Sequence, residues 1–256
     1  PGDAEAWAMA FQTGSAILVG GFVFTGPTSA FALIRYTKDG LIDSTFGTNG
    51  IVTTPMGPGD DLIRALAIQP DGKIIAVGWT FTGSNYDMAM ARYNTNGTLD
   101  NSFGNNGKVV SGITSGNDWG KALKISGWSI VVGGGIMDNG TEDFYLSAYK
   151  FNGSSDSSFG TNGIVITPMG GGDGEIGALD MQPDSAIVVL GTASTLSTHN
   201  FALARYHYNG ILDSTFGTNG KVISTGGVND DEAIALALQP DGKIIAGGYS
   251  NTGIND

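Results

Sequence analysis

Short apolar runs alternate with glycine- and asparagine-rich segments along the whole chain. Residues 65 to 69 alternate small and large side chains, and the sequence PDG at 70 to 72 leads into a second apolar run at 73 to 78. A short connection containing proline and glycine between two such runs is typical of a β-hairpin. Two further runs, at 88 to 93 and 108 to 110, predict a third and a fourth strand.

Both faces of these strands are apolar. In the run FALIRY at 31 to 36 and the run FALARY at 201 to 206, alanine alternates with leucine, isoleucine or phenylalanine. Successive side chains of a strand point to opposite faces, so one face carries small side chains and the other carries large ones. A sheet of this kind needs cover on both sides.

The four-strand pattern recurs with a period of 57 or 56 residues. Four kinds of landmark keep this spacing: a glycine in the second apolar run, a tyrosine ending the third, and an aspartate and a phenylalanine in the loop that follows. They are Gly21, Gly78, Gly134, Gly191 and Gly248; Tyr36, Tyr93, Tyr149 and Tyr206; Asp43, Asp100, Asp156 and Asp213; Phe46, Phe103, Phe159 and Phe216. The repeats cover approximately 3–56, 57–114, 115–170, 171–227 and, in part, 228–256.

Stacking of such repeats gives each sheet its cover, as in the blades of a β-propeller. The sequence therefore predicts an all-β fold, a single β-propeller domain over 1–256 built from four-stranded antiparallel blades of about 57 residues. Four blades are complete and a half blade remains, which gives eighteen strands. A β-trefoil has three units and helical repeats do not carry this much glycine, so both fit the sequence less well.

Charge and composition remove several classes of function. The net charge of −12 and the absence of a basic cluster argue against nucleic acid as a partner. No apolar run approaches the ~18 residues that a membrane-spanning helix needs. With no cysteine, the chain has no disulfide, thiolate metal site or cysteine nucleophile. It starts without methionine or a signal peptide, so we interpret it as a processed or excised segment.

The loop motif identifies a resemblance. The pattern RY-x-x-[DN]-G-x-[IL]-D-x-[ST]-F-G-x-[ND]-G-[KI]-V occurs at 35–52, 92–109 and 205–222, and A-L-A-[IL]-Q-P-D-G-K-I-I-A-x-G at 65–78 and 235–248. This combination resembles the bacterial delta-60 repeat family, a β-propeller domain of unknown function. The resemblance implies a bacterial protein that is secreted or exposed on the cell surface, and it implies no known reaction. The third repeat departs most, with Ala148 in place of the motif's arginine.

The repeated charged residues are expected to serve the fold. Asp43, Asp100, Asp156 and Asp213 lie where an aspartate caps a short turn, and the phenylalanine three residues later can fill the gap between blades. A calcium site is the alternative for these aspartates, but the EF-hand spacing is absent. Arg35, Arg92 and Arg205 are expected to pair with blade carboxylates, with anion binding near the axis as the alternative.

Residues unique to one repeat are better candidates for chemistry. Trp119 and Trp128, with Asp118 and Lys121 beside them, form one group in the third repeat. The pairs Glu142-Asp143 and Asp173 with Glu175 could supply the two carboxylates of a glycosidase. The only histidines, His199 and His207, lie at opposite ends of one predicted strand, too far apart to share a metal. Asn96, Asn139 and Asn152 match the glycosylation acceptor pattern.

No residue is assigned as catalytic, cofactor-binding or metal-binding, and no cofactor is expected. The leading hypothesis is a non-enzymatic, secreted or cell-surface propeller that acts as an interaction, binding or assembly scaffold. Its expected partner is another protein or further copies of itself. We expect the half blade to be completed by continuation of the natural protein, with completion by a neighbouring chain as the alternative, because sheets avoid open edges. The alternative is a glycan-binding or glycan-cleaving propeller that uses the third-repeat tryptophans and acidic residues.

Overall fold

The computed structural model describes residues 3–127, 129–138, 140–170, 172–195, 198–224 and 230–251. Within these ranges the chain forms strands and turns and no helix, so no described segment is a helix long and apolar enough to span a membrane. Contacts between residues group the chain into two compact units. The first unit is 1–128 with 151–154, and the second is 129–150 with 155–256.

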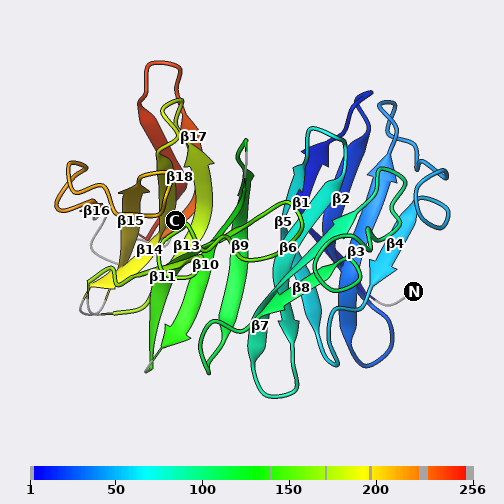
Figure 1. Cartoon of the computed structure of the whole chain (residues 1–256), viewed down its shortest axis with the longest axis horizontal. Coiled ribbons are helices and arrows are strands. Elements are labelled where there is room, and N and C mark those ends of the chain that lie inside the picture. The colour runs from blue at the N-terminus through cyan, green and yellow to red at the C-terminus, as the bar shows by residue number, and fades with distance from the viewer. Residues whose placement is uncertain are drawn as a thin grey trace. The chain divides into compact units, whose positions relative to one another are not determined.

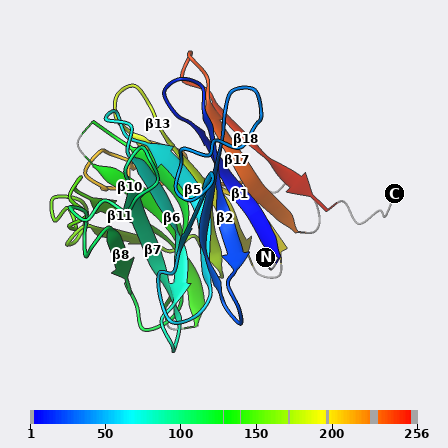
Figure 2. The ribbon, with the colours of Figure 1, turned by 90° about the vertical axis from the view of Figure 1, so that its right-hand side faces the viewer.

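The first unit contains the first two sheets and one further strand (Figure 1). Its strands are β1 (Ala4–Phe11), β2 (Ile17–Phe24), β3 (Ser29–Tyr36), β4 (Ile51–Thr54), β5 (Asp61–Ile68), β6 (Ile74–Phe81), β7 (Tyr86–Tyr93), β8 (Lys108–Ser111) and β9 (Asp118–Ile125). Strands β1 to β4 form one antiparallel sheet in chain order, and β5 to β8 form the next. Figure 2 shows β5, β6 and β7 side by side.

The second unit repeats this plan. Its strands are β10 (Ile130–Asp138), β11 (Thr141–Tyr149), β12 (Ile164–Thr167), β13 (Gly174–Met181), β14 (Ile187–Thr195), β15 (Thr198–Tyr206), β16 (Lys221–Ser224), β17 (Asp231–Leu238) and β18 (Ile244–Ser250). The third sheet follows the order β9 to β12, the fourth β13 to β16, and β17 pairs with β18 alone. In the described residues the chain therefore forms four four-stranded blades and one two-stranded sheet, which confirms the predicted all-β propeller architecture.

The strands extend further than the apolar alternation predicts. The first strand of the second repeat begins at Asp61, ahead of the predicted start at Ala65, and β6 continues to Phe81 past Gly78. Gly78 lies inside a strand because β5 carries a bulge between Ile63 and Ala65, which brings the carbonyl of Leu62 close to it. A Cβ atom at Gly78 would lie 1.8 Å from the Leu62 oxygen, so only glycine fits. The landmark glycine therefore marks a bulge and not the end of a strand.

Each blade obtains its cover from the next blade in the same unit. In the first unit, Leu18, Phe31 and Leu33 of the first sheet pack in one core with Ile63 and Tyr93 of the second, all at most 1% exposed. In the second unit, the buried hydroxyl of Tyr206 on β15 donates a hydrogen bond to Thr167 Oγ1 on β12, at 2.8 Å. Burial raises the pKa of Tyr206 to about 12, and the bond to Thr167 opposes that rise. Stacking of the repeats therefore supplies the core, as the two apolar faces predict.

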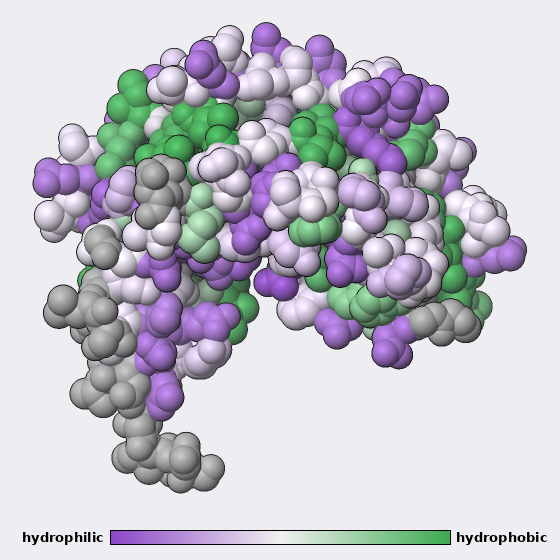
Figure 3. Space-filling view, turned by 90° about the horizontal axis from the view of Figure 1, so that it is seen from below, coloured by the Kyte–Doolittle hydropathy of each residue, from purple (hydrophilic) through white to green (hydrophobic). Residues whose placement is uncertain are grey.

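The surface is a mixture of hydrophilic and hydrophobic patches, as one face of the molecule shows (Figure 3). Several large apolar side chains are exposed, and two of the most exposed lie on β1, where Met9 is 60% and Phe11 65% exposed. Their equivalents on β5, Leu66 and Ile68, pack against the core between the first and second sheets. The face of β1 that carries Met9 and Phe11 is therefore exposed, whereas the equivalent apolar face of β5 is covered by the first sheet.

Candidate functional site

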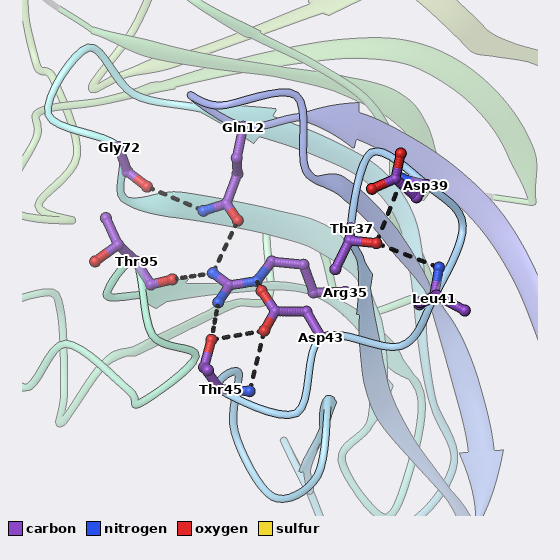
Figure 4. A network of polar contacts seen from close by, with 9 residues as sticks. All are labelled: Gln12, Arg35, Thr37, Asp39, Leu41, Asp43, Thr45, Gly72 and Thr95. Carbon is purple, nitrogen blue, oxygen red and sulfur yellow. Dashed lines mark hydrogen bonds and ion pairs between the residues drawn. The ribbon is translucent and has the colours of Figure 1, made fainter.

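The repeated loop is built around an arginine, an aspartate and a phenylalanine, and Figure 4 shows Arg35 and Asp43 of the first repeat. Asp43 Oδ1 accepts hydrogen bonds from the backbone nitrogen of Thr45 at 3.0 Å and from its hydroxyl at 2.6 Å, which caps the turn. Arg35 Nε donates to Asp43 Oδ2 at 2.9 Å, and the guanidinium lies 4.6 Å from the centroid of the Phe46 ring. The Thr45 hydrogen bonds, with help from Arg35, lower the pKa of Asp43.

The same loop joins each blade to the next. Arg35 Nη1 donates to the Thr95 carbonyl at 2.6 Å, and the backbone nitrogen of Gly47 donates to the Asn96 carbonyl at 2.8 Å. In the next repeat, Arg92 donates to the Phe151 carbonyl and Gly104 to the Asn152 carbonyl. Thr95, Asn96, Phe151 and Asn152 all lie one repeat further along the chain.

These contacts confirm the predicted capping role of the aspartates and the arginine–carboxylate pairs. Phe46, Phe103 and Phe159 lie against Gly97, Gly153 and Gly210 of the following repeats, which confirms their inter-blade position. Arg92 and Arg205 repeat the ion pair, with Nε 2.8 Å from Asp100 and from Asp213. Phe46 and Phe103 are fully buried, and Phe159 is 3% exposed. In the third repeat Ala148 cannot form the pair, and Asp156 keeps only its turn contacts with Ser158.

A second set of side-chain oxygens, three from aspartates and one from an asparagine, joins neighbouring blades just before a first strand. Asp60 Oδ1 accepts a hydrogen bond from the backbone nitrogen of Ser29 at 2.8 Å, across 31 residues. Oδ1 of Asn117 accepts in the same way from the backbone nitrogen of Tyr86 at 3.0 Å. Asp173 accepts from the backbone nitrogen of Glu142 at 2.9 Å, and Asp230 from that of His199 at 2.9 Å. Asp173, one of the candidate glycosidase carboxylates, therefore holds a structural bond that recurs through the chain.

The third-repeat group around Trp119 also has a structural part. Asp118 is fully buried, and its carboxylate accepts hydrogen bonds from the backbone nitrogens of Ile113 and Thr114 at 2.6 and 3.0 Å. Asp61 has the same place in the second repeat, where burial raises its pKa. Trp119 and Lys121 follow on β9 with partly exposed side chains, and Trp128 lies outside the described residues. The acceptor oxygens of Asn96 and Asn152 bond to Thr98 and Ser154 in turns, and Asn139 lies outside the described residues.

The second unit contains an acidic cavity of about 310 Å³. Six carboxylates line it, together with the imidazole of His199, the hydroxyl of Thr192 and the ring of Tyr249. The carboxylates are Glu142, Asp173, Glu175, Asp230, Asp231 and Glu232. The structure thus brings together three of the four acidic residues proposed from the sequence, and Asp143 is not among the lining residues. His207 lies in the turn after β15 and does not line the cavity.

The cavity exists because large side chains are missing from one position of the repeat. In the second repeat Leu62 and Trp79 are paired across β5 and β6, and in the fourth repeat Glu175 and Thr192 take these two places. In the third repeat the same place as Trp79 is Gly135, where a Cβ atom would lie 2.1 Å from Glu142 Oε1 and 3.0 Å from Glu175 Cβ. Glycine there makes room for both glutamates.

Hydrogen bonds fix the positions of two of the lining carboxylates, those of Asp230 and Glu232. Asp230 accepts from the backbone of His199 and lies 3.1 Å from its Nδ1, and these contacts lower the pKa of Asp230. Tyr249 donates to Glu232 Oε2, which raises the pKa of the tyrosine, and its ring is 54% exposed. The described residues contain no group of three or more histidines and carboxylates placed to hold a metal ion. The cavity therefore offers many hydrogen-bond acceptors beside one exposed aromatic ring.

Comparison with solved structures supports the fold. A protein from Parabacteroides distasonis, provisionally described as a glycoside hydrolase, aligns over 96% of this chain and 86% of its own with a TM-score of 0.50 and 11% identity. A second structure comes from work on the GH130 family of mannoside phosphorylases, which contains glycoside hydrolases that target β-1,2 mannosidic linkages in Candida mannan. It aligns over 97% of this chain and 85% of its own, with a TM-score of 0.49 and 11% identity. At this identity the likeness concerns the fold alone.

Comparison of the sequence itself gives no significant match to a curated protein. A family model described as a domain of unknown function (DUF5122) beta-propeller matches residues 14–46, 69–103, 182–216 and 239–256. These segments make up slightly less than half of the chain and fall in the first, second, fourth and fifth repeats, so the unmatched repeat is the one that lacks the arginine. The chain is a β-propeller, similar in four of its five repeats to this family of unknown function.

Proposed function

We propose that this chain is a non-enzymatic binding module whose ligand site is the acidic cavity of the second unit, and that the ligand is a saccharide. The observation that carries the proposal is the loss of the aromatic ring found at Phe22, Trp79 and Tyr249. The third and fourth repeats have Gly135 and Thr192 at this position, and Gly135 makes room for Glu142. A repeat that serves only the fold has no reason to give up this ring in two neighbouring repeats and leave a cavity lined by carboxylates. The loss of the ring therefore supports a binding role there.

The chemistry of the lining favours a hydroxyl-rich ligand. Carboxylate oxygens accept hydrogen bonds from neighbouring hydroxyl groups, and such charge-assisted bonds are stronger than neutral ones. The exposed ring of Tyr249 offers an apolar face with a polar edge, on which a sugar ring can stack. Six carboxylates against one imidazole repel anions, so we expect neutral or amino-bearing saccharides and no sialylated or sulfated ones.

A binding role fits the carboxylates better than a catalytic one. Asp173 and Asp230 accept hydrogen bonds from backbone nitrogens in the same manner as Asp60 in the first unit. Their oxygens therefore serve the stacking of the blades as well as the wall of the cavity. We also propose that the protein works outside the cell or on its surface and belongs to the delta-60 repeat family, as the repeat motif supports.

A glycan array probed with the labelled chain tests the proposal. We expect selective binding to neutral or amino-bearing glycans, weakened about tenfold or more in Glu175→Gln because a charge-assisted acceptor is lost. Glu5→Gln is the matched control, since Glu5 has the same strand position in the first repeat and lies outside the cavity. The proposal fails if no glycan is bound, if Glu175→Gln binds as well as the wild type, or if bound glycans are cleaved.

The exposed face of β1 supports a second function, assembly with further copies of the chain. Met9 and Phe11 have the strand positions of Leu66 and Ile68, which pack against the first blade within the first unit. A blade from another copy could cover them in the same way and offer strands to the two-stranded sheet β17–β18. Light scattering should give a mass above 26.3 kDa for the wild type and 26.3 kDa for Phe11→Ser. A monomeric wild type would exclude this function.

A further inference from the structure

A second cavity, in the first unit, lies beside the Arg35–Asp43 pair (Figure 4). It measures about 230 Å³ and is formed by the hairpin between β1 and β2 together with backbone of the next repeat. The residues that matter for the argument are Gln12, Ala16, Arg35, Asp43, Gly72 and Thr95. This cavity belongs to the loop network described above and is separate from the acidic cavity of the second unit.

The second repeat shows what fills the corresponding space there. Ala16 and Lys73 occupy the same position, since each accepts, through its carbonyl, the closing hydrogen bond of its hairpin turn, from Gln12 and Gln69 respectively. The ammonium group of Lys73 lies 2.8 Å from Asp100 Oδ2. In the first repeat the alanine side chain ends at Cβ, so the place of the lysine chain and its ammonium group becomes the cavity.

The carboxylates of the two repeats are otherwise bound alike. Asp100 Oδ1 accepts from the nitrogen and hydroxyl of Ser102, as Asp43 Oδ1 does from Thr45, and each Oδ2 faces the Nε of its arginine. Only Asp100 Oδ2 has the additional ammonium partner. A carboxylate offers about four acceptor sites, so Asp43 Oδ2 can take one more donor. Its side chain is 20% exposed, against 9% for Asp100.

Most donors of Arg35 are already engaged, which argues against an anion. The guanidinium of Arg35 donates to Asp43, to Gln12 Oε1 at 3.2 Å, to the Thr95 carbonyl at 2.6 Å and to Thr45 Oγ1 at 3.1 Å. Gln12 in turn donates through Nε2 to the Gly72 carbonyl at 3.4 Å. The open acceptor site of Asp43 Oδ2 therefore favours a hydrogen-bond donor as the entering group, and the second repeat has a full positive charge at this place.

We propose that this cavity binds a primary ammonium group on a short alkyl chain, in the position that Lys73 fills from within the second repeat. One ammonium hydrogen is donated to Asp43 Oδ2, and the alkyl part lies over Ala16. The group can belong to a free amine or to a lysine side chain of a partner, and both sources present the same chemistry. This proposal is independent of the saccharide site, because the two cavities lie in different units.

The probe is n-propylammonium chloride, which reproduces the lysine side chain beyond Cβ, followed by the backbone amide signals of Asp43 and Thr45 in a two-dimensional NMR titration. We expect saturable shifts in the wild type and none with 1-propanol, which has the same size and no charge. In Ala16→Lys the new side chain fills the cavity, so these shifts should disappear. In Lys73→Ala a second set of saturable shifts should appear at Asp100 and Ser102.

Two further arms complete the test. Asp43→Asn should weaken binding about tenfold or more, since a hydrogen bond to a charged group is lost. Nα-acetyl-lysine methylamide that binds more tightly than propylammonium indicates a partner's side chain as the natural ligand, and weaker binding indicates a free amine. The proposal is overturned if propylammonium does not saturate, if 1-propanol shifts the same signals, or if Ala16→Lys responds as the wild type does. Ala16→Lys retains the loop carboxylate, so its result holds even if Asp43→Asn does not fold.

Discussion

Removal of the Phe103 ring tests how the repeated loop holds one blade to the next. Phe103 is fully buried, and it lies against Gly153 of the following repeat, where an added Cβ would be 3.2 Å from the ring's Cδ2. The guanidinium of Arg92 lies 4.7 Å from the ring centroid. Phe103→Ala therefore removes a core aromatic, at about 3–5 kcal/mol, and a largely buried cation–π contact of about 1 kcal/mol. We expect a loss near 4 kcal/mol, at the lower end of the combined range of about 4–6 kcal/mol.

Urea unfolding followed by tryptophan fluorescence measures this loss in the relevant part of the chain. All four tryptophans lie at positions 7, 79, 119 and 128, inside the segment assigned to the first unit, which also contains Phe103. Leu41→Ala is the control, because Leu41 lies in a loop of the same unit and is 69% exposed, so its truncation should change stability by no more than about 0.5 kcal/mol. Equal effects of Phe103→Ala and Leu41→Ala would refute the inter-blade role of the ring.

The remaining predictions concern acid and the turn glycines. The Thr215 hydrogen bonds, and then Arg205, lower the pKa of Asp213 from 3.8 to about 2, so the ionised form stabilises the fold above the unfolded pKa and this contribution is lost as pH falls toward 2. Asp213→Asn should therefore lower the melting temperature at pH 7, and the deficit should shrink between about pH 4 and pH 2; a constant deficit would contradict the role of the charge. Gly153→Ala should destabilise more than Gly14→Ala in thermal unfolding. Both glycines have positive φ, at 86° and 85°, but a Cβ at Gly153 would lie 2.7 Å from Gly104 N whereas Gly14 has nothing within 4 Å. Equal losses of thermal stability in the two variants would contradict the role of the close contact between Gly153 and Gly104, because the positive φ alone would then explain them.

Much of the fold can be predicted from the sequence because the same residues recur at the same positions of successive repeats. The aspartate of the loop, its hydroxyl partner two residues later and the phenylalanine recur together, so a turn cap and a plug between blades follow without knowledge of the sheets. The positive φ of Asn49 and Gly50, at 54° and 91°, is likewise a local property of an asparagine–glycine turn. Strand ends were harder to predict, since the bulge at Gly78 depends on the neighbouring strand.

The acidic cavity could be anticipated only in part. Glutamates at 142 and 175 can be recognised as unusual, but their meeting depends on blade stacking, which brings together residues 33 positions apart. The structural bond of Asp173 was missed for the same reason, since its partner lies 31 residues away in the preceding blade. One signal was available: when the repeats are aligned, Trp79 corresponds to Gly135 and Thr192, and a loss of volume at one position in neighbouring repeats indicates a hollow.

Chemical-shift mapping of a saccharide selected on the glycan array is the most direct test of the proposed binding function. The account predicts that the backbone amides of Thr192, His199 and Tyr249 shift together and saturate with one affinity, because all three residues line the acidic cavity. It also predicts that Glu175→Gln weakens the affinity read from these shifts about tenfold or more. Saturable shifts confined to residues of the first unit, or no saturable shift at all, would contradict it.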